Sequence, residues 1–214
     1  MKPYYQDSLC AIYHGDCREV WPAWGETVVM LTDPPYGIAY KSGQYGVLAR
    51  EITGDDDTSL RDHAPERWNG GDALVFGTWR APRPAETRMV LIWDKGGALG
   101  MGDLALPWKP GHEEIYVLGR GFSGPRTSDV LCVAPVQSMA ANGRTHPHEK
   151  PVALLSALLQ KCDARSVFDP FMGTGATLIA AKSLGRRAIG IEIEERYCEI
   201  AAQRLSQETL GLTA

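Results

Sequence analysis

Asp33, Pro34, Pro35 and Tyr36 stand together directly after the apolar run "TVVMLT". Proline fixes φ and lacks a backbone N–H, so two consecutive prolines end a strand and leave a rigid turn rich in hydrogen-bond acceptors. The Asp33 carboxylate, the Pro34 carbonyl and the Tyr36 ring would thus be held in fixed positions. An ordinary β-turn also favours Asp and Pro, so the turn alone does not identify a catalytic site.

A glycine turn near the other end of the chain is a second candidate site. The segment "SVFDPFMGTGATLIAAKSLG" (166–185) has the pattern of a strand, a turn and a helix. Gly173 and Gly175 let the backbone turn sharply and approach a ligand, with the amides at the helix start facing it. The NAD fingerprint needs a small residue where this chain has Leu178, so the spacing favours an adenosine-bearing ligand without a pyrophosphate.

Glu192 closes the strand that we predict over 188–193, 17 residues beyond Gly175. A carboxylate at such a strand end can accept hydrogen bonds from ribose hydroxyls. Alternatively, Glu192 begins the charged run "EIEER" as a solvated helix cap. The glycine turn upstream leads us to favour ribose binding.

Two motifs carry a family resemblance. "DPFMGTG" with "GIEIEERYCEIAAQRL" resembles the S-adenosylmethionine-binding region of DNA amino-methyltransferases, and "DPPYG" resembles their catalytic tetrapeptide. The resemblance extends through "YHGDC", "IWDKGG", "HEEIYVLGRG" and "HPHEKP", and it covers most of the chain. The cofactor turn comes last, as in the permuted β group of this family.

The resemblance implies an α/β fold, a single Rossmann-like methyltransferase domain over 1–214 with helices on both faces of the sheet and a circularly permuted motif order. It also implies methyl transfer from S-adenosyl-L-methionine to the N6 amine of a flipped-out adenine in DNA. The residues that it assigns are Asp33, Pro34, Pro35 and Tyr36 for catalysis; Asp16, Asp169, Pro170, Phe171, Gly173, Thr174, Gly175, Glu192 and Lys150 for the cofactor; and Arg120, Arg126 and Lys95 for DNA.

Within this scheme the Asp33 carboxylate and the Pro34 carbonyl accept hydrogen bonds from the two N–H groups of the target amine, and Tyr36 stacks on the flipped base. Three residues keep a second interpretation. Asp16 either contacts the cofactor adenine or caps a helix starting at "CREVW". Lys150 either lies at the methionine end of the cofactor or belongs to a plain loop before a helix. Trp93 lines the base pocket together with Lys95, or it packs in the core.

Other activities compete with adenine methylation. Cytosine N4 is the nearest alternative, because cytosine enzymes of the family also carry an aspartate in the tetrapeptide. A catalytically inactive DNA-binding module of the same fold is the alternative from another class. Methylation of RNA or protein is a third, but enzymes of those kinds with a similar tetrapeptide usually place the cofactor turn first.

The elements that must position these residues follow from hydrophobic patterning. Short apolar runs between turn signals predict seven strands in a mainly parallel sheet, since several runs are continuous rather than alternating. These strands are 9–13, 27–31, 73–76, 89–93, 114–118, 166–169 and 188–193. Helices are predicted after Pro151, over 176–185 and from the "EERY" run to Gly211, so the carboxyl-terminal part is an α/β unit.

The motif order divides the chain into a catalytic region (1–118), a candidate DNA-recognition loop (119–149) and a cofactor-binding region (150–214). The segment 38–58 is a second long loop, and such loops are often functional. The recognition loop is short, which predicts relaxed sequence specificity with Arg120 and Arg126 contacting mainly phosphates. The resemblance also implies a homodimer as one assembly.

Composition is that of an ordinary globular protein. The 214 residues are 44% hydrophobic and 22% charged, with a net charge of -4. No apolar run approaches a membrane span, and no cleavable signal pattern begins the chain, so we expect a cytoplasmic protein of a prokaryotic cell or phage-infected host. The five cysteines lack zinc-ligand spacing, and His146 with His148 has no third ligand in view, so no metal site is predicted.

Overall fold

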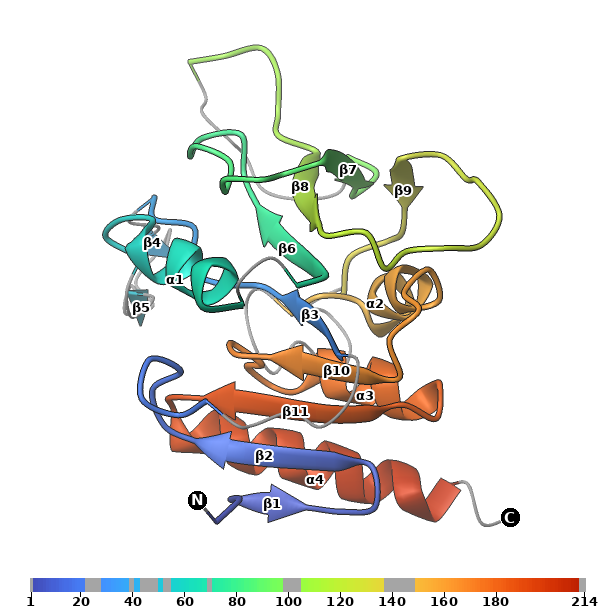
Figure 1. Cartoon of the computed structure of the whole chain (residues 1–214). Coiled ribbons are helices and arrows are strands. Elements are labelled where there is room, and N and C mark those ends of the chain that lie inside the picture. Colours follow the sequence, from blue (N-terminus) through green and yellow to red (C-terminus); the bar gives the residue numbers. More distant parts are fainter. Residues whose placement is uncertain are drawn as a thin grey trace.

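Figure 1 shows the computed structural model of the chain, an open sheet with helices packed against it. The structure describes residues 2–21, 28–38, 41–42, 50–51, 55–68, 71–97, 105–136 and 149–211. Within these ranges nine strands form the main sheet, in the order β1-β2-β11-β10-β3-β6-β8-β7-β9. They are β1 (Tyr5–Gln6), β2 (Cys10–His14), β3 (Val28–Thr32), β6 (Ala73–Gly77), β7 (Met89–Asp94), β8 (His112–Leu118), β9 (Val130–Cys132), β10 (Ser166–Asp169) and β11 (Arg187–Glu192).

The middle of the sheet is parallel and joins the two ends of the chain. Strands β2, β11, β10, β3 and β6 are successive parallel neighbours, and Val167 of β10 stands opposite Val29 of β3. Parallel strands end at the same edge, so the residues that follow these five strands meet there; we call it the carboxyl edge. The permuted order therefore brings the glycine turn and the turn 33–36, which we call the Asp33 turn, together at the carboxyl edge.

The remaining strands are placed by antiparallel pairing. Strand β8 runs antiparallel to both β6 and β7, so it begins at the carboxyl edge and ends at the opposite edge, which we call the amino edge. Strand β9 runs parallel to β7 and returns the chain to the carboxyl edge. A separate antiparallel pair, β4 (Lys41–Ser42) with β5 (Arg50–Glu51), follows the Asp33 turn.

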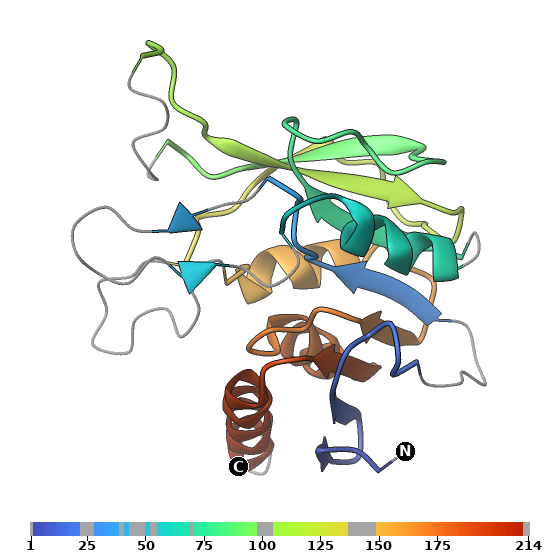
Figure 2. The same ribbon diagram turned by 90° about the vertical axis from the view of Figure 1, so that its left-hand side faces the viewer.

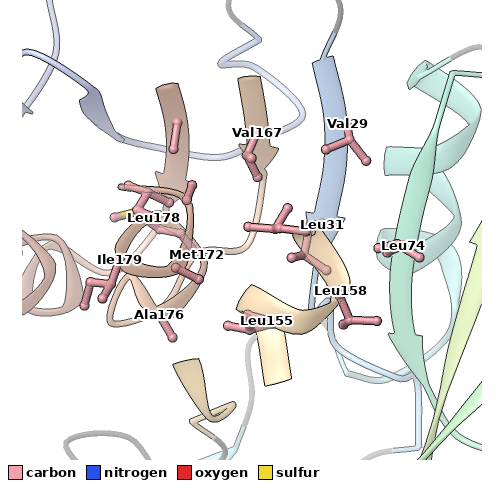
Figure 3. Close-up of a cluster of buried hydrophobic side chains, with 14 of the residues drawn as sticks. Val29, Leu31, Leu74, Leu155, Leu158, Val167, Met172, Ala176, Leu178 and Ile179 are labelled. Atoms are coloured by element: carbon pink, nitrogen blue, oxygen red, sulfur yellow. The ribbon is translucent and has the colours of Figure 1, made fainter. Parts of the chain in front are cut away.

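Successive side chains of β3 are buried in two different hydrophobic cores, because helices cover both faces of this strand. One core lies between the sheet and three helices, α2 (Val152–Leu159), α3 (Ala176–Ser183) and α4 (Glu195–Gly211). Figure 3 shows Leu31 of β3 close to Leu155 and Leu158 of α2. Each such leucine gains about 1.5–3 kcal/mol from burial, so these helices are held mainly by packing.

The second core lies on the opposite face of the sheet and is covered by α1 (Ser59–Trp68). Met30 of β3 points into this core with Ala64 of α1, and the ring of Trp68 stacks on Phe168 at a centroid distance of 5.6 Å. Figure 2 shows α1 on the other side of the sheet from α2. The predicted placement of helices on both faces is confirmed.

All seven predicted strands are present, one with the predicted bounds and six with bounds shifted by one or two residues, but the predicted strand count was wrong. The additional strands β1 and β9 have two and three residues, which is too short to leave a pattern in sequence. Helix α1 was also missed, because its ten residues are mostly polar and include Pro65 in their interior. Among the described residues, no helix is both long and apolar enough to cross a membrane.

Candidate active site

The Asp33 turn leaves the carboxyl end of β3 and is held in place by a segment that follows it. Gly37 has a φ of +72°, and its backbone N–H donates to the Asp55 carboxylate at 2.7 Å. A Cβ added to Gly37 would lie 2.3 Å from the backbone carbon of Asp57. Asp55 is 3% exposed, so a buried carboxylate from the predicted loop 38–58 fixes the turn that carries Asp33.

Tyr36 folds back over the turn and lies between two carboxylates. Its hydroxyl oxygen is 2.8 Å from Asp33 Oδ1 and 3.0 Å from Glu113 Oε2. Burial, with the charges of Asp33 and Glu113, raises the pKa of Tyr36 well above its usual range. The phenol therefore stays neutral and acts as a hydrogen-bond donor to a carboxylate.

Two lysines balance the two carboxylates. The Lys150 ammonium pairs with Asp33 Oδ2 and lies 3.3 Å from Glu113 Oε2, while the Lys95 ammonium pairs with Glu113 Oε1. Burial lowers the pKa of Lys150, but Asp33 and Glu113 raise it above its usual value. Burial opposes ionisation of Glu113, but Lys150 and Lys95 lower its pKa to about 2, so Glu113 and Lys150 are both charged at neutral pH.

Lys150 therefore lies against the Asp33 turn in this structure. Its side chain is 7% exposed, and its Nζ is 5.0 Å from the centre of the Phe76 ring and 5.7 Å from that of Tyr36. Sequence reasoning had assigned Lys150 to the cofactor and Lys95 to DNA, whereas the described contacts of both include the carboxylate of Glu113. Asp33 keeps 26% of its side chain exposed, so a substrate can reach it.

The glycine turn connects β10 to α3 at the same edge. Gly173 and Gly175 have φ of +51° and +82°, and Gly175 is the N-cap of α3. A Cβ on Gly175 would lie 2.9 Å from Cβ of Ala201 on α4, whereas a Cβ on Gly173 would meet nothing within 4 Å. The backbone at Gly173 thus borders open space, as a turn that approaches a ligand requires.

Glu192 ends β11 beside this turn. Its carboxylate accepts hydrogen bonds from the backbone N–H of Gly173 at 3.0 Å and of Glu194 at 2.8 Å, and burial raises its pKa. The bond from Glu194 is a local turn contact one residue before α4 begins, so it does not cap that helix as the alternative interpretation expected. The bond from Gly173 places the carboxylate at the glycine turn, and the next residue, Ile193, exposes 46% of its apolar side chain.

Asp16 follows β2 and adjoins Glu192 through the backbone, since the N–H of Gly15 donates to the Glu192 carbonyl at 2.9 Å. The Asp16 carboxylate accepts the backbone N–H of Arg18 at 2.8 Å and both Nε and Nη2 of the same side chain. Residues 16–19 form a turn and no helix, so the predicted helix after Asp16 is wrong. The Asp16 carboxylate nevertheless accepts a backbone N–H of the following turn, as a capping residue would.

Asp169 joins the glycine turn to the Asp33 turn. It is 2% exposed and accepts the Thr32 hydroxyl at 2.7 Å and the backbone N–H of Phe171 at 3.0 Å. Burial raises its pKa to about 6. Pro170 is buried beside it. Asp169 and Pro170 therefore anchor the glycine turn to the carboxyl edge of the sheet.

Arg204 of α4 braces the other side of the glycine turn. Its Nη1 donates to the carbonyl of Thr174 at 2.8 Å and to the Thr174 hydroxyl at 3.0 Å, and its Nη2 lies 2.7 Å from the Glu149 carboxylate. Glu149 directly precedes Lys150. One arginine thereby ties the glycine turn to the segment that delivers Lys150 to Asp33.

The structure does not bring Arg120 and Arg126 to this site. Both are exposed and follow β8, which ends at the amino edge, and the backbone N–H of Arg120 donates to Asp72 at the start of β6. The predicted recognition loop 119–149 is therefore divided, because β9 carries the chain from the amino edge back to the carboxyl edge. The part from 137 to 148, with His146 and His148, lies outside the described residues.

Trp93 belongs to the core, with 2% of its surface exposed and its indole N–H donating to the Val133 carbonyl at 2.8 Å.

Sequence reasoning missed Glu113, Asp55 and Arg204 as site residues. A signal for Glu113 was present in "HEEIYVL", where two adjacent carboxylates begin a buried strand and must point to opposite faces. In the described part of the chain, no group of three His, Cys, Asp or Glu residues is arranged to hold a metal ion.

Known proteins match this chain in sequence and in fold. A family model described as DNA methylase matches residues 108–203. YubD of Escherichia coli (strain K12), which carries the name of a methylase, is 31% identical over 212 residues, covering 90% of this chain and 88% of YubD. This likeness extends far beyond the two motifs at the carboxyl edge.

Two solved structures show the same fold at low sequence identity. The PvuII DNA methyltransferase, described as cytosine-N4-specific, is 16% identical with a TM-score of 0.66, covering 94% of this chain and 88% of that one. M1.HpyAVI, solved as a complex with SAM, is 20% identical with a TM-score of 0.59, covering 92% of this chain and 100% of that one. The predicted Rossmann-like α/β fold is thereby confirmed.

Proposed function

The chain belongs to the N6/N4 family of DNA methylases, and on that premise we propose that it transfers a methyl group to N6 of an adenine flipped out of duplex DNA. The observation that carries the proposal is the meeting of two turns at the carboxyl edge. Asp33 follows Thr32, Asp169 begins the glycine turn, and the side chains of Thr32 and Asp169 are hydrogen-bonded at 2.7 Å. A methyl donor held at one turn is thus adjacent to an amine held at the other.

S-adenosyl-L-methionine, the methyl donor of the family, supplies a sulfonium-bound methyl group and its own leaving group. The described residues fit such a molecule. Gly173 borders open space, Glu192 presents a carboxylate for ribose hydroxyls, and Ile193 offers an exposed apolar surface for an adenine ring. Asp16 lies two residues beyond the end of the neighbouring strand β2, and Thr174 and Gly175 hold the turn in shape.

Asp33 and Pro34 prepare the amine. The lone pair of an exocyclic amine is delocalised into the base, so hydrogen bonds from both its protons to fixed acceptors favour a more nucleophilic, tetrahedral nitrogen. The Asp33 carboxylate and the Pro34 carbonyl are the two acceptors, and the adjacent prolines keep them rigid. Much of the acceleration then comes from holding the two reactants in line.

Tyr36 provides a surface for the flipped base. The Lys150 ammonium lies over its ring at 5.7 Å from the centre, and the phenol is fixed by Asp33 and Glu113. A ring held in this way can stack a base on its remaining face, which compensates for stacking lost on leaving the duplex.

DNA is proposed to lie over the carboxyl edge, because the reacting atoms must meet there. Exposed aromatic and basic side chains flank that edge: Trp79 with Arg80 follows β6, and Trp108 with Lys109 precedes β8. Basic side chains contact phosphates, and aromatic rings stack on bases that leave the duplex. Phosphate contacts by Arg120 and Arg126 would require the DNA to reach the amino edge as well.

Methylation of short duplexes tests the reaction. Incubation with S-adenosyl-L-methionine, digestion to nucleosides and mass spectrometry should reveal N6-methyladenine, and Asp33→Asn should reduce the product by at least about 100-fold if Asp33 activates the amine. Recovery of N4-methylcytosine instead would assign the cytosine alternative, which the likeness to the PvuII enzyme keeps open. Absence of transfer together with absence of cofactor binding in calorimetry would support the inactive DNA-binding module.

A further inference from the structure

Glu113 shares its hydrogen-bond donors with Asp33. Tyr36 Oη is 2.8 Å from Asp33 Oδ1 and 3.0 Å from Glu113 Oε2, and Lys150 contacts both carboxylates as well. Resting on the proposed function, we infer that Glu113 is a positioning residue that holds the Tyr36 hydroxyl and the Lys150 ammonium while the Asp33 carboxylate accepts a hydrogen bond from the target amine.

The Tyr36 hydroxyl shows why a second acceptor matters. A phenol has one proton, so it donates to Asp33 or to Glu113 but not to both at once. The two oxygens differ by only 0.2 Å in distance from Tyr36 Oη (3.0 against 2.8 Å), so rotation of the hydroxyl transfers the hydrogen bond without moving the ring. Asp33 Oδ1 is then free to accept a hydrogen bond from the amine.

Lys150 presents the same situation with a full charge. Its ammonium pairs with Asp33 Oδ2 and lies 3.3 Å from Glu113 Oε2, while its side chain is 7% exposed. An ammonium at this depth needs a partner at all times, because burial of an unpaired charge is strongly unfavourable. Glu113 keeps that partner in place while the Asp33 carboxylate engages the substrate.

Glu113 is itself held for this role. Lys95 pairs with Oε1, which leaves Oε2 toward Tyr36 and Lys150. Its backbone stands opposite Trp93 in the antiparallel register of β7 and β8, so the side chain is anchored on the sheet rather than on a loop. Lys95 thus serves the site through Glu113.

Glu114 provides a matched control. It is the next residue of β8, its side chain points to the opposite face, and it also binds a tyrosine and a cation: Tyr116 Oη at 2.9 Å and Arg83 Nη2 at 2.9 Å. Within the described part of the chain, no hydrogen bond or ion pair joins this cluster to Asp33. Replacing Glu113 or Glu114 with glutamine therefore removes the same charge from the same strand, with different consequences for Asp33.

The experiment compares Glu113→Gln, Glu114→Gln and the wild type as full chains on an adenine-containing duplex. We expect Glu113→Gln to lower kcat by about 10- to 100-fold, the equivalent of one buried donor left poorly satisfied. The dissociation constant for S-adenosyl-L-methionine, measured by calorimetry, should stay within about twofold if Glu113 acts only through Asp33. Glu114→Gln should retain the wild-type kcat.

Two further measurements exclude a merely structural effect. In a Tyr36→Phe background, the penalty of Glu113→Gln should shrink several-fold, because the hydroxyl that Glu113 retains has been removed. With 2-aminopurine in place of the target adenine, Glu113→Gln should reduce the fluorescence increase that reports a flipped base. An inactive wild type would overturn the proposed function itself, whereas an active wild type with equal effects of both glutamine variants would overturn only the role of Glu113.

Discussion

The side chains of Thr32 and Asp169 are hydrogen-bonded at 2.7 Å although 137 residues separate them in the chain. Thr32 ends β3 immediately before Asp33, and Asp169 ends β10 immediately before the glycine turn. Both side chains are nearly fully buried. This bond fixes the spacing between the two turns that the proposed reaction must bring together.

Thr32→Val removes this bond while keeping the side-chain shape. We expect the free energy of unfolding to fall by about 1–3 kcal/mol, the usual cost of an unsatisfied buried partner, and kcat/KM to fall because the turns lose their alignment. Thr177→Val is the control, since Thr177 also bonds Asp169 but from within the glycine-turn region. If the two variants reduce kcat/KM equally, the bond between the turns has no special role.

Asp169 predicts a pH dependence of stability. Its pKa is raised from 3.8 to about 6 in the folded chain, so the folded state binds more protons between these values. Its contribution to stability is full below pH 3.8 and is lost as the pH rises through about 6, a change of roughly 3 kcal/mol. Glu113 acts in the opposite direction below pH 4.5, where its lowered pKa makes stability fall with acidification.

Urea unfolding of Asp169→Asn and wild type at pH 5 and pH 7 isolates this contribution. The asparagine does not titrate, so the variant should lose less stability than the wild type on going from pH 5 to pH 7. Equal losses in the two proteins would show that Asp169 is already ionised at pH 5.

Gly37→Ala should damage the Asp33 turn more than the backbone angle alone explains. Gly37 has φ of +72° and Gly185 has φ of +67°, so alanine costs about 1 kcal/mol at either position. Only at Gly37 would the new Cβ collide with backbone, 2.3 Å from the carbonyl carbon of Asp57. Thermal unfolding and methyl transfer should therefore both suffer more in Gly37→Ala than in Gly185→Ala.

Salt dependence of DNA binding locates the phosphate contacts. Arg80→Ala with Lys109→Ala should lower the slope of log affinity against log salt by about 1 to 2, because each lost phosphate contact removes roughly 0.9 from it. Arg120→Ala with Arg126→Ala should leave the slope near that of the wild type if DNA covers only the carboxyl edge. The reverse result would restore the sequence-based assignment of Arg120 and Arg126 to the phosphate backbone.

Much of the fold follows from the sequence alone. The continuous apolar runs, the double proline and the glycines of "DPFMGTG" report local backbone geometry, and local geometry is encoded by neighbouring residues. Strands such as β3 and β10 were therefore predicted nearly to the residue. Short strands such as β1 and β9 were missed, because two or three residues carry no period and depend on pairing with a neighbour.

The order of motifs in the sequence determined that one turn carries acceptors, that another suits an adenosine-bearing ligand, and that the two belong to one site. Only the tertiary structure decided which charges surround Asp33. Glu113, Lys95 and Lys150 come from separate segments, and their pairing depends on how β7, β8 and the segment before α2 meet at the carboxyl edge. Such long-range contacts leave no spacing pattern in the chain, because an ion pair requires proximity in space and not in sequence.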